Sequence, residues 1–123
     1  MRFAAAPEHV RTARLVAVSA ARRARMSEDR LDEVRLVTGE LCTRAVLRTR
    51  QTGTRAPVEV QMIAHPDRYE ITVIDVGNAA EETPAQAALD VAAGSADAVE
   101  ITDGPAGTGG TVRATWLYDD GPR

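Results

Sequence analysis

The chain has no lysine, one cysteine and few aromatic residues. All 15 of its basic residues are arginines, and phenylalanine, tyrosine and tryptophan together make up 3% of the sequence. The single cysteine, Cys42, excludes an internal disulfide and a cysteine-based metal cluster. The core must therefore consist mainly of alanine, valine, isoleucine and leucine. We attribute the preference for arginine to the coding bias of a GC-rich genome rather than to phosphate recognition.

The sequence also lacks long apolar runs and an excess of positive charge. No stretch approaches the ~20 apolar residues that a membrane-spanning helix needs. The apolar stretch that begins at Phe3 is too short for a signal peptide and is followed by Pro7 and charged residues. A net charge of −3 gives no overall attraction to nucleic acid or to an anionic membrane. We therefore expect a cytoplasmic protein with no nucleic-acid or membrane partner, folded as a single domain over residues 1–123.

Two long helices are predicted in the first half of the chain. Pro7 is well placed to open a helix over residues 8–25, and small apolar residues recur there at helical spacing. Ser27 and the two acidic residues after it predict the start of a second helix, which runs from about 28 to 50 and ends at Gly53. We expect the first helix to bury Val10, Ala13, Ala17, Ala20 and Ala24, and the second to bury Leu31, Val34, Val37 or Thr38, Leu41 and Ala45.

The second half of the chain reads mainly as strands. Apolar and polar residues alternate from 58 to 62 and from 69 to 73, with a hairpin turn at 65–68 between them. An alanine-rich helix is expected at 85–97, a short strand at 98–102, a glycine-rich loop at 103–110 and a last strand at 111–118; residues 2–6 could add an edge strand. This order predicts an α+β two-layer sandwich, in which a mostly antiparallel sheet of four to five strands carries two long helices and a variable third on one face.

Several short motifs resemble those of the GHKL, or Bergerat-fold, ATPases. The stretch from Glu40 to Arg44 is similar to the Glu-x-x-x-Asn of the family's second helix, Asp75-Val76-Gly77 to its adenine-binding Asp-x-Gly, and Gly110-Thr111-Val112 to its closing strand. Together with the opening Ala-Pro-Glu-His-Val-Arg, the order of these motifs resembles the small anti-sigma-factor serine kinases of bacteria.

The sequence departs from this pattern where the family holds metal and phosphate. Arg44 replaces the asparagine, Arg48 replaces a histidine that often follows it, and the lid glycines are absent, with Ala87-Ala88-Leu89 in their place. The resemblance implies that a glutamate at position 40 activates the attacking hydroxyl, and that an asparagine at 44 would give a neutral oxygen to Mg²⁺. A guanidinium has no such oxygen and would repel the ion.

Two positions for Arg44 follow from this departure. Because Glu40 and Arg44 are four residues apart on one helix, they could form an ion pair worth about 0.3–0.5 kcal/mol if exposed. Alternatively, Arg44 could bind a triphosphate directly. We favour the ion pair; a solvated helix face is the ordinary alternative for both residues.

The remaining site residues have structural alternatives too. The resemblance implies that Asp75 accepts a hydrogen bond from the adenine amino group, and that Gly77 lets the base lie close to the backbone; a strand-ending Asx turn explains Asp75 equally well. Gly110 and Thr111 would lie near phosphate, although the glycine-rich stretch before them lacks the lysine of a P-loop and is better explained as a hairpin loop.

Three functions remain open. In the first, which we favour, the chain binds a protein partner, a sigma factor or an anti-sigma antagonist, and ATP, ADP and Mg²⁺ binding is weakened or lost. In the second it is an active ATP-dependent serine kinase that uses Glu40 as base. In the third it is a non-catalytic subunit of a homodimer or heterodimer. No residue is predicted as a metal ligand.

Overall fold

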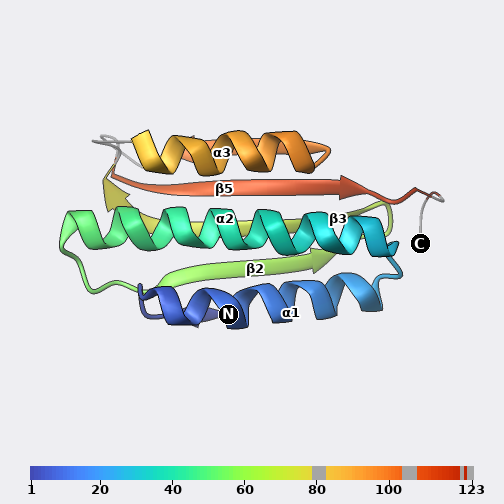
Figure 1. Ribbon diagram of the computed structural model, residues 1–123, viewed down its shortest axis with the longest axis horizontal. Coiled ribbons are helices and arrows are strands. Elements are labelled where there is room, and N and C mark those ends of the chain that lie inside the picture. Colours follow the sequence, from blue (N-terminus) through green and yellow to red (C-terminus); the bar gives the residue numbers. More distant parts are fainter. Residues whose placement is uncertain (79–82, 104–107, 120, 122–123) are drawn as a thin grey trace.

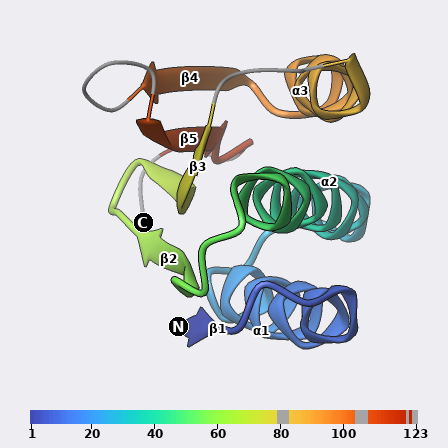
Figure 2. The ribbon, with the colours of Figure 1, turned by 90° about the vertical axis from the view of Figure 1, so that its left-hand side faces the viewer.

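The computed structural model describes residues 1–78, 83–103, 108–119 and 121. Helices cover one face of a five-stranded antiparallel sheet with the strand order β1-β2-β3-β5-β4 (Figure 2). The strands are β1 (Arg2–Phe3), β2 (Val58–Ala64), β3 (Arg68–Asn78), β4 (Ala98–Asp103) and β5 (Thr108–Leu117), and the helices are α1 (Val10–Arg23), α2 (Glu28–Thr52) and α3 (Thr83–Ser95). This arrangement confirms the predicted two-layer α+β sandwich. No helix in the described ranges has the length and apolarity needed to span a membrane.

The first helix begins and ends with tight turns. Residues Pro7–His9 form one turn of 3₁₀ helix before α1, as expected of proline at a helix start. At the other end the Arg25 N–H donates to the Arg22 carbonyl at 3.0 Å and the Met26 N–H donates to the Ala21 carbonyl at 3.2 Å. This pairing is a Schellman motif, with Arg25 at φ 63° where glycine is usual. The buried face of α1 is Val10, Ala13, Ala17, Val18 and Ala21; Ala20 and Ala24 are only partly buried, because the face turns slightly from the predicted stripe.

The second helix is the centre of the helical layer and lies between α1 and α3 (Figure 1). The Ser27 hydroxyl accepts a hydrogen bond from the Arg30 N–H at 3.4 Å, and Gly53 ends the helix at φ 78°, as predicted. The whole predicted stripe is buried. So are Cys42, Arg44, Val46, Arg48 and Thr49, because α2 contacts neighbours on three sides: two helices and the sheet.

The sheet places the end of β3 next to the start of β5. Asp75 is paired with Gly110 and Asn78 with Thr108, with a bulge between the two pairs. The prediction of a loop over 103–110 is therefore wrong at its C-terminal end, because residues 108–110 belong to β5; residues 104–107 lie outside the described part of the chain. The core against the helices contains Tyr69 of β3 and Trp116 of β5.

Candidate functional site

The candidate site lies where the end of β3 meets the middle of α2. The Asp75 side chain is 2% exposed, and its register partner is Gly110 on β5. The Gly77 N–H donates to Asp75 Oδ1 at 2.7 Å. This bond from a residue two positions ahead is the Asx turn considered as the structural explanation of Asp75, so the side chain shapes the end of its own strand.

Arg48 reaches this carboxylate from α2. Its Nε donates to Asp75 Oδ1 at 3.2 Å, and its side chain is 2% exposed. Two opposite charges that are both removed from water interact much more strongly than a surface pair. The pair therefore joins the helical layer to the sheet inside the core.

The two glycines of the site also contact Arg48. A methyl group on Gly77 would lie 2.6 Å from both the carbonyl carbon and Cβ of Arg48, and one on Gly110 would lie 3.3 Å from Arg48 Nη2. Gly77 thus allows the α2 backbone to approach β3, and Gly110 leaves space for the guanidinium. From the sequence we expected a nucleotide base to lie close to the Gly77 backbone. In the described part of the chain, α2 takes this close position.

Arg44 lies one helical turn before Arg48 and faces the same carboxylate. Its Nη1 is 4.0 Å from Asp75 Oδ2, and the side chain is 5% exposed. Among the described residues Glu40 forms no ion pair with Arg44, so the pair that we favoured from the sequence is not present. Burial explains the difference: α2 directs Arg44 toward the buried Asp75, whereas Glu40 is only partly buried.

Glu40 lines a hollow of about 320 Å³ together with Arg14, Arg35, Leu36 and Thr43. The hollow lies between α1 and α2, and a methyl group on Gly39 would be 2.9 Å from Cδ of Arg14. Although Glu40 and Arg44 are four residues apart, they therefore lie in different surroundings: Glu40 in this hollow and Arg44 beside Asp75.

Thr111 is out of phase with the rest of the site. It pairs with Ile74, one position away from the Asp75–Gly110 pair, and successive side chains of a strand point to opposite faces. Thr111 therefore lies on the face away from the helices. Of the six residues selected from the sequence, the fold brings together Arg44, Asp75, Gly77 and Gly110 and leaves out Glu40 and Thr111.

Arg48 is the residue that sequence reasoning left out of the candidate site. Its signal was available, because it continues the four-residue spacing from Glu40 to Arg44 along one helix face and lies within the buried part of α2. An arginine at a core position needs a partner. An acidic residue at the end of an apolar strand, such as Asp75, was the obvious choice.

The other chemically reactive side chains have structural surroundings. Cys42 is fully buried, and desolvation raises the pKa of its thiol to about 12, against a smaller lowering effect of Arg14. His65 lies 2.7 Å from Glu70. The described residues contain no group of three or more histidine, cysteine, aspartate or glutamate side chains that could hold a metal ion.

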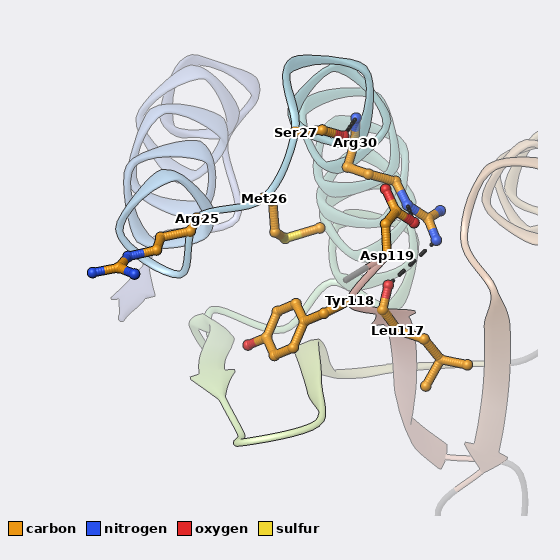
Figure 3. A pocket seen from close by; sticks show the side chains of 7 residues that line it. All are labelled: Arg25, Met26, Ser27, Arg30, Leu117, Tyr118 and Asp119. Carbon is orange, nitrogen blue, oxygen red and sulfur yellow. Dashed lines mark hydrogen bonds and ion pairs between the residues drawn. The ribbon is translucent and has the colours of Figure 1, made fainter. Parts of the chain in front are cut away.

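A small hollow of about 140 Å³ lies at the start of α2, beside the turn between α1 and α2 (Figure 3). Arg30 extends across it, donating to Asp97 at 2.7 Å, to Glu33 at 3.0 Å and to the Leu117 carbonyl at 3.4 Å. Asp97 also accepts the Leu117 N–H at 2.7 Å. This cluster ties the start of α2 to the end of β5, so we assign it a structural role.

The fold and the site together define a class of protein. Three helices on one face of an antiparallel sheet, with a buried aspartate and a glycine at the end of the middle strand, are the features expected of an ATPase domain of the GHKL type. Residues 3–116 match the family described as the histidine kinase-like ATPase domain (HATPase_c_2), and the chain belongs to this family. No curated protein matches it.

Proposed function

We propose that this chain acts by binding a protein partner, a sigma factor or an anti-sigma antagonist, and that its ATP site is impaired. The observation that carries the proposal is the engagement of Asp75 by Arg48 within the core. The choice of partner class rests on the resemblance of the sequence to anti-sigma-factor kinases.

The first argument concerns the base of the nucleotide. An adenine amino group donates a hydrogen bond, so it needs a carboxylate oxygen that can accept one. Asp75 Oδ1 already accepts hydrogen bonds from Arg48 Nε at 3.2 Å and the Gly77 N–H at 2.7 Å. Binding adenine in the family's manner would bring its amino group to a carboxylate already held by the Arg48 guanidinium, and breaking that buried ion pair would be strongly unfavourable. Arg48 and the Gly77 N–H thus donate to Asp75 in place of the adenine amino group.

The second argument concerns the metal. Mg²⁺ takes oxygen ligands in an octahedral arrangement, and Arg44 offers only N–H donors and a permanent charge. Among the described residues, Arg44 and Arg48 both lie close to the buried Asp75 carboxylate. A divalent cation placed here would meet repulsion, so the residues at this position do not fit a magnesium-bridged triphosphate.

One observation favours the second candidate, an active serine kinase. Glu40 is partly buried, lines a hollow and forms no ion pair with any described residue, so its carboxylate could serve as a base. Phosphate transfer from ATP to a partner serine, abolished in Glu40→Gln, would establish this function in place of the first.

Calorimetry with ATP and ADP, with and without Mg²⁺, tests the proposal on the full chain. We expect no saturable heat for the wild type at about 1 mM nucleotide, and metal-dependent binding in Arg44→Asn/Arg48→His, which restores the residue types that the family carries. Arg50→Asn, an exposed change on the same helix, is the matched control and should behave as wild type. Micromolar binding of Mg·ATP by the wild type would refute the impaired site.

A further inference from the structure

The outer edge of β2 is only partly covered. β1 pairs with its first residues, Phe3 with Val58 and Arg2 with Glu59. Met1 continues this line, since its carbonyl accepts the Val60 N–H at 2.8 Å and its amino group donates to the Val60 carbonyl at 2.6 Å. β2 continues to Ala64, beyond the chain end marked N in Figure 1. Among the described residues no strand lies beside positions 61–64 on this side.

The backbone groups at this edge have a defined direction. Both polar groups of Val60 face β1, and in an antiparallel ladder residues two apart along a strand point their N–H and C=O groups the same way. The N–H and C=O groups of Met62 and Ala64 therefore point outward, to the open edge. Such a row of backbone groups is a template for the addition of another strand.

Two hollows of about 460 Å³ each lie along the same edge. One is lined by the apolar residues Val16, Val60, Met62 and Ile63, together with Met1, Arg2, Glu59 and Gln61. The other lies at the far end of β2 and is lined by Arg23, Ala24, Arg25, Ala64, His65 and Pro66, with Tyr118. Among the described residues, no acidic side chain lines the second hollow and Arg23 forms no ion pair.

We propose that the β2 edge at residues 61–64 binds an extended segment of a protein partner as an added antiparallel strand, in line with β1. Directly opposite residues of neighbouring strands share a face, as Phe3 and Val58 do in the core. The partner residues opposite Met62 and Ala64 thus face α1. The first meets Val16 and Met62 in the first hollow and is apolar; the second meets Arg23 in the second hollow and is acidic.

This inference rests on the proposed action through a protein partner, and it is independent of the nucleotide site. Val16 and Ile63 are 39% and 44% exposed, so the added strand would cover apolar surface as well as complete the edge. Since the strand runs antiparallel to β2, its acidic residue precedes its apolar residue by two positions. The recognised feature is therefore Glu-x-Val or a chemically similar sequence in extended form.

The probe is a fluorescein-labelled peptide, Gly-Ser-Glu-Thr-Val-Thr, whose binding to the full chain is measured by fluorescence anisotropy without nucleotide. N-methylation of the valine removes the N–H that pairs with the Met62 carbonyl, whereas N-methylation of the preceding threonine alters an N–H that faces away. We expect the first change to weaken binding about tenfold and the second to leave it nearly unchanged. These two peptides test the edge without altering the protein.

Protein variants provide the second comparison. Met62→Pro removes the outward N–H and leaves the bonds to β3 in place, as proline is tolerated at edges; Met62→Ala is its control. Arg23→Glu should weaken binding of the peptide that carries glutamate and strengthen binding of an analogue that carries lysine at the same position.

The proposal is overturned if the parent peptide does not bind saturably, or if both N-methylated peptides bind equally. It is also overturned if the open edge pairs with a second copy, seen as a concentration-dependent dimer that Met62→Pro abolishes. Nucleotide binding by the wild type would refute the impaired ATP site and leave these results unchanged.

Discussion

Replacement of Arg48 by methionine tests the central contact of the site. Methionine keeps most of the apolar length of the side chain and removes the guanidinium. The Asp75 carboxylate, 2% exposed, would then retain the Gly77 N–H at 2.7 Å and Arg44 Nη1 at 4.0 Å. It would lose the donor at 3.2 Å.

The expected loss of unfolding free energy follows from the burial of Asp75. Removing one partner of a buried ion pair costs about 3–5 kcal/mol, because the remaining charge is left without compensation. Arg44 supplies a second, more distant cation, so we expect a loss near the lower limit, about 3 kcal/mol of unfolding free energy. That is a large part of the total of about 5–15 kcal/mol that a domain of this size has, but it leaves the variant folded.

A double-mutant cycle separates the charge from the packing. Arg48→Met/Asp75→Asn removes both charges while the amide oxygen can still accept the Gly77 N–H. The free energy of unfolding, from urea denaturation followed by circular dichroism, should recover by about 1.5 kcal/mol relative to the single variant. Arg50→Met, at an exposed position of the same helix, should change stability by less than about 0.5 kcal/mol. A similarly small effect of Arg48→Met, or no recovery in the double variant, would refute the reasoning.

Three further predictions concern other parts of the fold. Gly77→Ala should destabilise the chain by about 2–3 kcal/mol in urea unfolding, since its methyl group would lie 2.6 Å from the α2 backbone, whereas Gly94→Ala in α3, with no atom within 4 Å, should stabilise it slightly. Arg25→Gly should raise the melting temperature, with a gain of up to about 1 kcal/mol, because glycine adopts φ 63° without strain; an unchanged or lower melting temperature would contradict this. Cys42, whose buried thiol has its pKa raised from 9.0 to about 12, should react with a thiol reagent at pH 8 only on unfolding. The unfolded thiol ionises first as pH rises, so the stability that the buried thiol contributes is complete below about pH 9 and is lost towards pH 12; Cys42→Ala should lack this component of the pH dependence.

The sequence was sufficient for the elements whose signals are local. Helix α2 begins after Ser27 and ends at Gly53, as predicted, because capping depends on hydroxyl geometry and on a residue that tolerates a left-handed conformation. The alternation around the β2–β3 hairpin placed both strands, and helical periodicity identified the buried stripe of α2. These signals need only a few neighbouring residues, so they can be read without knowing the fold.

The contacts of the site could not be read in the same way. The i,i+4 rule predicts a pair between Glu40 and Arg44 on an isolated helix, but it ignores what lies across from the helix. Once α2 is packed on β3, Arg44 is buried and Asp75 is 4.0 Å away, so a long-range partner replaces the local one. The start of β5 at Thr108 was also missed, since its glycines resemble a loop and pair only because β3 is beside them.

The internal partner of Asp75 changes what nucleotide could contribute to this domain. In an ATP site, a buried carboxylate that accepts a hydrogen bond from the adenine amino group gains this donor only when the ligand is bound, and binding then stabilises the folded chain by mass action. Here Arg48 and the Gly77 N–H supply donors from within the chain and tie the end of β3 to the middle of α2. The backbone contributes to the same contact, because the missing Cβ of Gly77 lets α2 approach β3 closely. Under the proposed function, such a chain would keep the shape that a partner recognises without drawing folding free energy from ATP.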